Sequence, residues 1–383
     1  MRHQNSVFHQ LTKHIPWDVF DRSVACHGSD RRVRRLRTRD QFLALLYGQL
    51  SGATSLRAIE DGLSSHSTRL YHANARPVSR STLADANARR SFEVYADVFK
   101  TLVARSRPGV RRKLRDAVRL IDATKVKLSS RSKAWTPEIK EHYAAKVHVV
   151  YDPHEATPLN AVVTPHDVND ITPAKAFAIE AGATYVFDLA YYGFEWWKRL
   201  DDLGCRFVTR LKTYTKLEVN TSLPVPRDGA IIADRIGHLS KHIMKGKNPF
   251  TDPVREIIVR RDHDQMLRLV TNDLDAPAEE IAALYKQRWE IELFFKWIKQ
   301  NLKLKHFIGV NENAVKTQIY IALIAFLILR AAYSIQKSIP KPQAFARLVR
   351  LNIMQRRDLF TLKEPRDSNL KHLNQMTLAF IPC

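Results

Sequence analysis

The middle of the chain alternates short apolar runs with stretches of helical period. The apolar runs predict strands at 118–122, 146–151, 159–164, 184–189 and 206–211, and the periodic stretches predict helices at 173–181 and 194–203. Strands that come first alone and then alternate with helices indicate a mixed α/β sheet. We therefore expect an α/β core in this part of the chain.

A segment of different character follows this core. Residues 212–275 are rich in β-prone pieces separated by Pro, Gly and Asn, which predicts a β-rich insertion. The pattern turns helical from Ala276 to about Leu304, and residues 312–336 are expected to form a last long apolar helix. The tail after Lys337 is basic and carries little signal.

The first hundred residues have the pattern of a helical region. Helices are expected at 41–50, after a capping-box spacing of Thr38 and Gln41, at 56–62, and from Ser79 or Ser81 to about residue 102. A Pro–Gly pair among the basic residues of 105–115 indicates a boundary. The expected domains are a helical region (1–110), the first part of the core (111–211), the insertion (212–275), a helical completion of the core (276–336) and a basic tail (337–383).

The 383-residue chain is strongly basic, with 62 Lys and Arg against 39 Asp and Glu and a formal net charge of +23. Its 45% hydrophobic and 9% aromatic content is that of a globular protein. Such a surface attracts polyanions, chiefly nucleic acid or an anionic membrane, unless the high pI is incidental. The charge is uneven, because residues 1–115 hold 22 basic against 9 acidic residues, a net of +13.

Membrane and secreted classes find little support. The longest apolar run, Ile319–Leu329, has 11 residues, too few to span a bilayer, and predicts a buried helix. The first ten residues are polar, unlike a signal peptide. Three scattered cysteines, Cys26, Cys205 and Cys383, form neither a disulfide framework nor a zinc motif and indicate a reducing compartment. We expect no membrane partner and a cytoplasmic location.

Arginines cluster in the helical region. Residues 31–39, RRVRRLRTR, contain six of them, and the face of the third helix that we expect to be exposed carries Arg80, Asn87, Arg89 and Arg90. Guanidinium and amide groups suit phosphates and base edges. The region is therefore expected to bind double-stranded DNA. The alternative is a helical bundle with a solvated, charged surface.

Two aspartates stand at the carboxyl ends of predicted strands, Asp122 in 118–122 and Asp188 in 184–189. Ligand and metal sites gather at this edge of open α/β sheets. Mg²⁺ prefers oxygen ligands, and a pair of such ions can activate an attacking oxygen and stabilise a leaving one in phosphoryl transfer. A lone aspartate at a strand end is more often a turn or cap residue, so neither position is specific by itself.

A third carboxylate, Glu292, lies on a predicted helix. At about 100° per residue, Tyr285, Arg288, Glu292 and Lys299 fall within roughly 60° of one another, beside an apolar stripe that would pack on the core. Such a polar seam suits a metal ligand flanked by phosphate-contacting groups. An ordinary amphipathic helix, with a salt link from Glu292 to Arg288 or Lys296, fits the same geometry.

The spacing Tyr-x2-Arg-x3-Glu-x6-Lys, here YKQRWEIELFFKWIK, resembles the signature of bacterial insertion-sequence transposases of family four, which are of the DDE type. The segments LIDATKVKL and YVFDLAYYGFEWW resemble the surroundings of the first two acidic positions of that family. Ala190 and Tyr191 stand where the family commonly has Gly and Tyr, a mild departure that leaves the metal ligand untouched. The resemblance covers about residues 110–335, and the preceding region resembles the N-terminal domain of such transposases more weakly.

The resemblance implies a fold and a metal site. The fold would be a ribonuclease H-like catalytic core with a β-rich insertion, preceded by an all-helical DNA-binding domain. Asp122, Asp188 and Glu292 would be the catalytic residues and would bind two Mg²⁺ ions, for which Mn²⁺ can substitute.

The resemblance also implies a function. The chain would bind terminal inverted repeats, cleave DNA and transfer its strands to target DNA, as a dimer in the DNA complex and in the bacterial nucleoid. Tyr285, Arg288 and Lys299 would contact phosphates of the transposon end. Three alternatives stay open: a nuclease that cuts without joining, a non-catalytic DNA-binding repressor derived from a transposase, and an RNA-binding protein.

Some aromatic and histidine side chains are candidates for a second role. In relatives that excise through a hairpin, an aromatic stacks on a flipped base, and Trp289, Trp297 or the pair 196–197 could do so here. Packing is the more common role for each. His148 and His166 could lie near the site, although a structural role is more common for such histidines as well.

Overall fold

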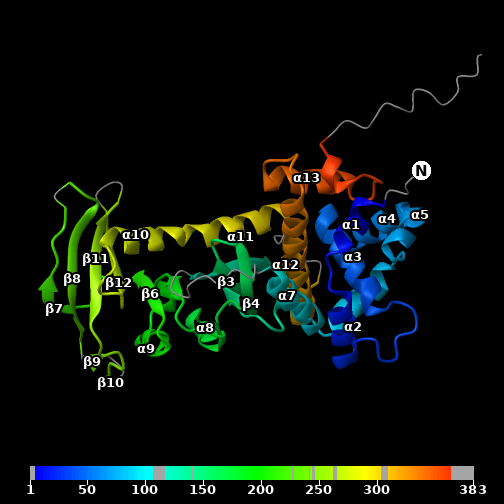
Figure 1. Cartoon of the computed structure of the whole chain (residues 1–383). Helices are drawn as coiled ribbons and strands as arrows, with labels where there is room; N and C mark the ends of the chain where they lie inside the picture. Colours follow the sequence, from blue (N-terminus) through cyan, green and yellow to red (C-terminus); the bar gives the residue numbers. More distant parts are fainter. Residues whose placement is uncertain are drawn as a thin grey trace, which may run out of the picture.

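The computed structural model describes residues 5–106, 117–139, 142–226, 228–240, 242–243, 246–261, 265–302 and 309–363. The molecule is elongated, with helices from both ends of the chain gathered at one end and a strand-rich part at the other (Figure 1). The boundary predicted at 105–115 lies mostly outside the described residues, as does the tail from residue 364.

The N-terminal region is helical, and it holds more helices than the sequence predicts. Its elements are α1 (Val7–Thr12), α2 (Trp17–Cys26), α3 (Thr38–Ser51), α4 (Leu56–Ser65), α5 (Ser67–Leu70), η1 (Tyr71–Ala73), α6 (Arg80–Arg89) and α7 (Glu93–Ser106). The first two were not predicted. α1 is too short to show a helical period, and α2 buries only Phe20 and Ser23.

The prediction of one long third helix is wrong, because the chain breaks between α6 and α7. Arg90 leaves the helical conformation, with φ −83° and ψ 135°. The side chain of Asn313 accepts a hydrogen bond from the N–H of Phe92 and donates to the carbonyls of Asn87 and Arg90. A residue distant in sequence thus satisfies the backbone groups that the break frees. Local sequence carries no sign of that contact.

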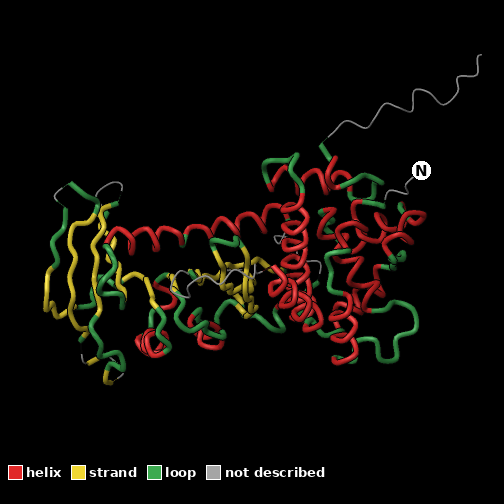
Figure 2. The backbone as a smooth tube through the Cα atoms, in the orientation of Figure 1, coloured by secondary structure: helices red, strands yellow, loops and turns green. Residues whose placement is uncertain are grey.

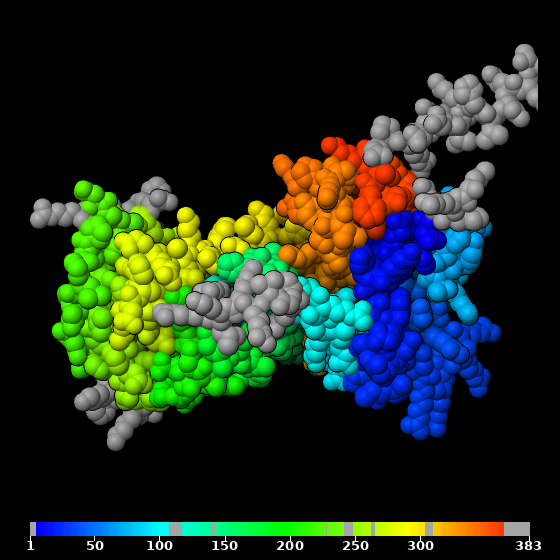
Figure 3. All heavy atoms as spheres, viewed as in Figure 1, coloured from blue at the N-terminus to red at the C-terminus, as the bar shows by residue number. Residues whose placement is uncertain are grey.

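The long helix α12 (Glu312–Ile335) is the buried helix that the sequence predicts. It packs against α3, α6 and α7, so that α12 and the N-terminal helices form one body (Figure 3). By length and composition α12 could cross a membrane, but 67% of its apolar window is buried inside the protein, as in the core helix of a folded domain. Helix α13 (Pro342–Asn352) packs against α12 and α3, within the segment predicted as a tail.

Ten strands form one large sheet in the order β2-β3-β1-β5-β6-β12-β11-β8-β7, with β4 paired to β3. The strands are β1 (Val118–Leu128), β2 (Glu138–Ile139), β3 (His142–Asp152), β4 (Thr157–Pro165), β5 (Thr184–Phe187), β6 (Arg206–Arg210), β7 (Leu217–Ser222), β8 (Ile231–Leu239), β11 (Val254–Arg260) and β12 (Met266–Thr271). β1, β5 and β6 are parallel neighbours, and the remaining pairs are antiparallel.

The β-rich segment 212–275 continues this sheet from β12 to β7. The sequence did not predict β8, because its burial repeats about every three residues rather than every two. A short separate pair, β9 (His242–Ile243) and β10 (Gly246–Lys247), follows β8.

Helices cover both faces of the central strands (Figure 2). α8 (Ile171–Ala176) and α9 (Phe194–Asp202) lie on one face over a core that contains Phe187, Trp196, Trp197 and Phe207. α10 (Ala278–Gln287) and α11 (Trp289–Asn301) run along the other face. The mixed α/β class predicted from the sequence is confirmed, and Trp196 and Trp197 are core residues.

Replacing Ile324, which is fully buried in α12, by alanine should lower the free energy of unfolding by about 2–5 kcal/mol, because the deletion leaves a cavity in a packed core. Ile335→Ala, at the 52% exposed end of the same helix, should change it by less than about 0.5 kcal/mol. Urea unfolding followed by circular dichroism measures both. Equal effects would contradict the placement of α12.

Candidate active site

The parallel register brings two aspartates side by side. Ile121 and Phe187 are the last residues that β1 and β5 pair with each other, and Asp122 and Asp188 directly follow them in the chain. β1 itself continues to Leu128, so the prediction that Asp122 ends its strand is wrong. Asp122 lies instead where the parallel pairing ends, because β5 stops there while β1 goes on paired with β3.

A cation that the sequence analysis missed lies on the third parallel strand. Val186 and Val208 are the last paired residues of β5 and β6, so Arg210 is level with Asp188 and on the same face. Arg210 is exposed, and it interacts electrostatically with Tyr285, as Asp188 does. The sequence did offer a signal for Arg210: it lies near the carboxyl end of the predicted strand 206–211, which follows the predicted strand of Asp188.

Helices α10 and α11 carry the remaining candidates across this edge of the sheet. The predicted continuous helix is wrong in one respect: Arg288 separates α10 from α11. Its backbone stays near helical values, with φ −51° and ψ −28°, and its N–H bonds to the carbonyl of Tyr285, three residues back. The two helices therefore keep nearly one direction (Figure 1). The expected apolar stripe is buried, including Ile291 and Ile298.

Arg288 forms ion pairs with two of the three carboxylates. Its Nη2 lies 2.5 Å from Glu292 Oε1, and its Nη1 lies 3.6 Å from Asp122 Oδ2. The salt link within the helix, one of the two interpretations of the sequence, is thus present. Lys299 donates to the hydroxyl of Thr124 on β1.

A cleft of about 440 Å³ opens between β1 and α11. Its lining consists of Asp122, Ala123, Thr124, Glu292, Phe295, Lys296, Lys299 and Gln300. Acidic groups from the strand and the helix therefore face an open cleft that is rimmed by Lys296 and Lys299.

The electrostatics of the cleft are those of crowded acids. Burial, followed by the nearby charges of Asp188 and Glu292, raises the pKa of Asp122 to about 7, although the N–H of Ala123 and the Arg288 guanidinium lower it. Asp188 accepts a hydrogen bond from the N–H of Ala190 in the turn that follows it. An additional cation would relieve the repulsion among these carboxylates.

The donor set fits a hard cation, since all three groups are carboxylates. As the described residues stand, no three His, Cys, Asp or Glu side chains gather closely enough to enclose a metal ion. Glu292 is turned toward Arg288, and its side chain is 34% exposed, so it has room to move. The site therefore has three carboxylates that could bind a divalent ion, and the Arg288 guanidinium pairs with two of them.

The turn after Asp188 explains why the family's glycine can be replaced. Ala190 does not have the positive φ that would require glycine, so a Cβ is tolerated at this position. The next residue, Tyr191, is fully buried and anchors the turn. His148 and His166 are also buried and bond to Thr164 and Thr136, which are structural contacts.

Not all of the expected DNA-binding residues are exposed. Arg80 and Arg89 are exposed on α6, and five arginines between 31 and 37 are exposed ahead of α3. The expectation that Asn87 and Arg90 lie on the same open face is wrong. Asn87 is buried against Gln41, and Arg90 donates to the Gln41 side chain and the carbonyl of Leu36.

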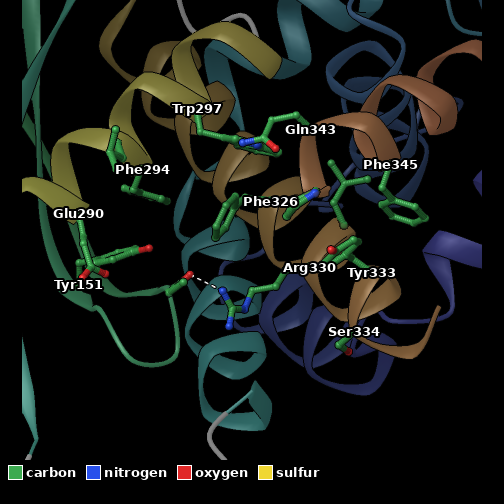
Figure 4. A pocket seen from close by; sticks show the side chains of 14 residues that line it. Tyr151, Glu290, Phe294, Trp297, Phe326, Arg330, Tyr333, Ser334, Gln343 and Phe345 are labelled. Atoms are coloured by element: carbon green, nitrogen blue, oxygen red, sulfur yellow. Dashed lines mark hydrogen bonds between the residues drawn. The ribbon is translucent and has the colours of Figure 1, made fainter. Parts of the chain in front are cut away.

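Figure 4 shows a second pocket, of about 490 Å³. The residues of α11 that line it lie on the opposite face of that helix from those that line the cleft. Aromatic residues of α11 and α12 line the pocket, and Trp297 packs edge-on against Phe326 there. Trp289, by contrast, is 58% exposed. Neither tryptophan lines the described carboxylate cleft.

Comparison with known proteins identifies the family. The chain matches the Transposase DDE domain over residues 113–328 and a Domain of unknown function (DUF4372) over residues 3–76. A Sinorhizobium fredii protein named as transposase y4zB is 37% identical over 78% of this chain and 86% of its own length. The chain belongs to the DDE transposases. A Geobacillus stearothermophilus protein named as the transposase of insertion sequence element IS5377 is 31% identical over 64% of this transposase and 66% of its own length.

Membership confirms the resemblance inferred from the sequence and gives the reaction class. The protein is an insertion-sequence transposase, an enzyme that cuts DNA and transfers strands, and its family depends on divalent metal. A solved piggyBac transposase synaptic complex with hairpin DNA covers 94% of this transposase and 81% of its own chain, with 12% identity and a TM-score of 0.46. That score is too low to establish a shared fold.

Asp122→Asn should stabilise the protein in EDTA, because it removes a buried carboxylate from a cluster of like charges. The folded pKa of Asp122, about 7, lies above its ordinary 3.8, so the parent loses stability relative to the variant as pH rises from about 4 to about 7. Thermal unfolding between pH 5 and 8 measures the difference. Asp85→Asn, at an exposed site on α6, should show no such gain. A variant less stable than the parent at every pH would contradict the electrostatic account.

Proposed function

We propose that Asp122, Asp188 and Glu292 hold the divalent ions of this transposase, Mg²⁺ in the cell, in a ribonuclease H-like core. The observation that supports this most directly is the parallel register that sets Asp122 beside Asp188, across a cleft from the helix that bears Glu292. Two bound ions would supply activation of the attacking oxygen and charge stabilisation of the leaving one. Mn²⁺ would have the same ligand preference.

The chain's own residues bind and orient the DNA end in this proposal. Arg288, Lys299 and Arg210 surround the carboxylates with cations that can pair with phosphate oxygens. The Cζ atom of Arg288 lies 5.9 Å from the centroid of the Tyr285 ring. The Tyr285 phenol adds a hydrogen-bond donor beside the guanidinium. These groups stand on β6 and on the α10–α11 pair, so packed elements would hold the partners of the scissile phosphate in place.

The N-terminal helices would supply most of the affinity for DNA. Exposed arginines on α6 and ahead of α3 suit the phosphates of the terminal repeats. We further propose that the transposase acts as a dimer on two transposon ends, and that it works in the bacterial cytoplasm at the nucleoid. Target DNA would be the second nucleic-acid partner.

Replacement of a ligand should abolish chemistry and spare binding. Glu292→Gln and Asp188→Asn should each lower cleavage and joining of a terminal-repeat substrate with Mg²⁺ by at least about a thousandfold, because carboxylates hold the ions that carry the transition-state charge. Gel assays of cut and joined products measure this. Glu290→Gln, a neighbouring acid that faces the aromatic pocket, is the matched control and should keep activity.

The same assay separates the alternatives. Cut DNA without joined product would indicate a nuclease on this core. Full activity of Glu292→Gln would remove Glu292 from the site. Binding of terminal repeats without metal-dependent products in the parent protein would favour a DNA-binding repressor.

Replacing the arginines of α6 by alanine should lower the affinity for DNA. It should also make that affinity less sensitive to salt concentration. Arg80→Ala combined with Arg89→Ala should lower the slope of log affinity against log salt by about 1–2, because each lost phosphate contact releases fewer counterions. Fluorescence anisotropy at several salt concentrations measures the slope. Arg22→Ala removes an equally exposed arginine from α2 and should leave the slope nearly unchanged. An unchanged slope in the double variant would exclude α6 from the DNA interface.

A further inference from the structure

We propose that Arg288 is an internal counter-ion that couples DNA binding to metal binding. It pairs with Asp122 and Glu292 until a phosphate of the DNA end replaces them as its partner, and the freed carboxylates then take the metal ions. This inference rests on the proposed role of the carboxylates and adds the order in which the site is completed.

The guanidinium of Arg288 competes directly with a metal ion for the same atoms. It lies 2.5 Å from Glu292 Oε1 and 3.6 Å from Asp122 Oδ2, oxygens that a divalent ion would need. The Arg288 side chain is only 19% exposed, so these charges are poorly screened by water. A cation already held there repels a second one and occupies the oxygens that would bind it.

Asp122 and Glu292 leave part of the hydrogen-bonding capacity of the Arg288 guanidinium unfilled. Its Nε is buried and has no hydrogen-bond partner among the described residues, and the 3.6 Å contact to Asp122 is too long for a hydrogen bond. Guanidinium groups pair best when two parallel N–H groups meet two oxygens of one anion. A phosphate offers such a set of oxygens, which two carboxylates on different elements do not.

The position of Arg288 in the chain makes an exchange of partners feasible. It lies at the joint between α10 and α11, where its N–H bonds three residues back rather than four. The Glu292 side chain is 34% exposed and can turn toward Asp122 without leaving an apolar core. Only side chains at the cleft need to move.

The exchange has a thermodynamic consequence. If Arg288 must leave the carboxylates before metal binds, DNA raises metal affinity, and metal raises DNA affinity by the same factor. Arg288 would thereby hold back metal binding until a DNA end is bound. The coupling should fall in the range of about 5–150-fold that is usual between linked sites.

Titration of the full-length protein with Mn²⁺, followed by electron paramagnetic resonance without DNA, tests the competition. Arg288→Met should bind Mn²⁺ at least about tenfold more tightly than the parent, because the competing charge is gone. Arg288→Lys, which keeps a charge and supports folding, should lie between the two. Lys296→Met removes a charge from the same rim without touching the pairs of Arg288 and should change the affinity by less than about twofold.

The coupling is measured by fluorescence anisotropy of a labelled terminal-repeat duplex, with and without Ca²⁺ at constant ionic strength. Ca²⁺ should raise the DNA affinity of the parent by about fivefold or more. It should raise the DNA affinity of Arg288→Met by less than about twofold. Equal Mn²⁺ affinities in the parent and both Arg288 variants would overturn the proposal. If Asp122→Asn and Glu292→Gln also left Mn²⁺ binding unchanged, the proposed ligands themselves would be wrong. If the Arg288 variants bound Mn²⁺ like the parent while Asp122→Asn and Glu292→Gln lost Mn²⁺ binding, the coupling would be refuted and the proposed ligands would stand.

Discussion

Repulsion among carboxylates is the constraint on which the site depends. The register of β1 and β5 puts Asp122 beside Asp188, and burial together with these neighbours raises the pKa of Asp122 to about 7. Such a cluster needs positive charge close by, because buried like charges are costly. Arg288 provides it from the joint of α10 and α11, and Arg210 stands on the next strand. The basic surroundings of the carboxylates thus offset their repulsion, and under the proposed function the same cations would meet the phosphate.

The scaffold fixes these groups from both faces of the sheet. Below the central strands, Trp196, Trp197 and Phe207 fill one core, and above them α10 and α11 pack on the other. Alternation along β5 sends Phe187 into the lower core and leaves Asp188 facing the helices. At the far end of α11, helix α12 joins the N-terminal helices to the sheet. Helix α12 thus connects the N-terminal helices by direct packing to the helix that bears Glu292.

Sequence alone predicted the elements whose pattern is local and missed those that depend on distant contacts. The strands around Asp188 and the helical face of Glu292 follow from period and spacing, and the α/β class followed from their order. The break at Arg90 depends on the side chain of Asn313, and burial of Asn87 depends on Gln41, neither of which is visible in local sequence. The salt link between Arg288 and Glu292 was one of two interpretations that spacing could not separate, and the ion pair of Arg288 with Asp122 joins two elements whose contact spacing does not show. The domain limits and the roles of individual residues stay predictions.

Cleavage of the polypeptide by radicals generated at a bound metal tests the central claim most directly. Fe²⁺ would replace Mg²⁺ in the DNA complex, and ascorbate with peroxide would produce hydroxyl radicals that cut the backbone next to the ion. The account predicts fragments that end near residues 122, 188 and 292, and their loss together in Asp188→Asn. Cuts at other positions, or the same fragments in that variant, would contradict a metal site built from these three carboxylates.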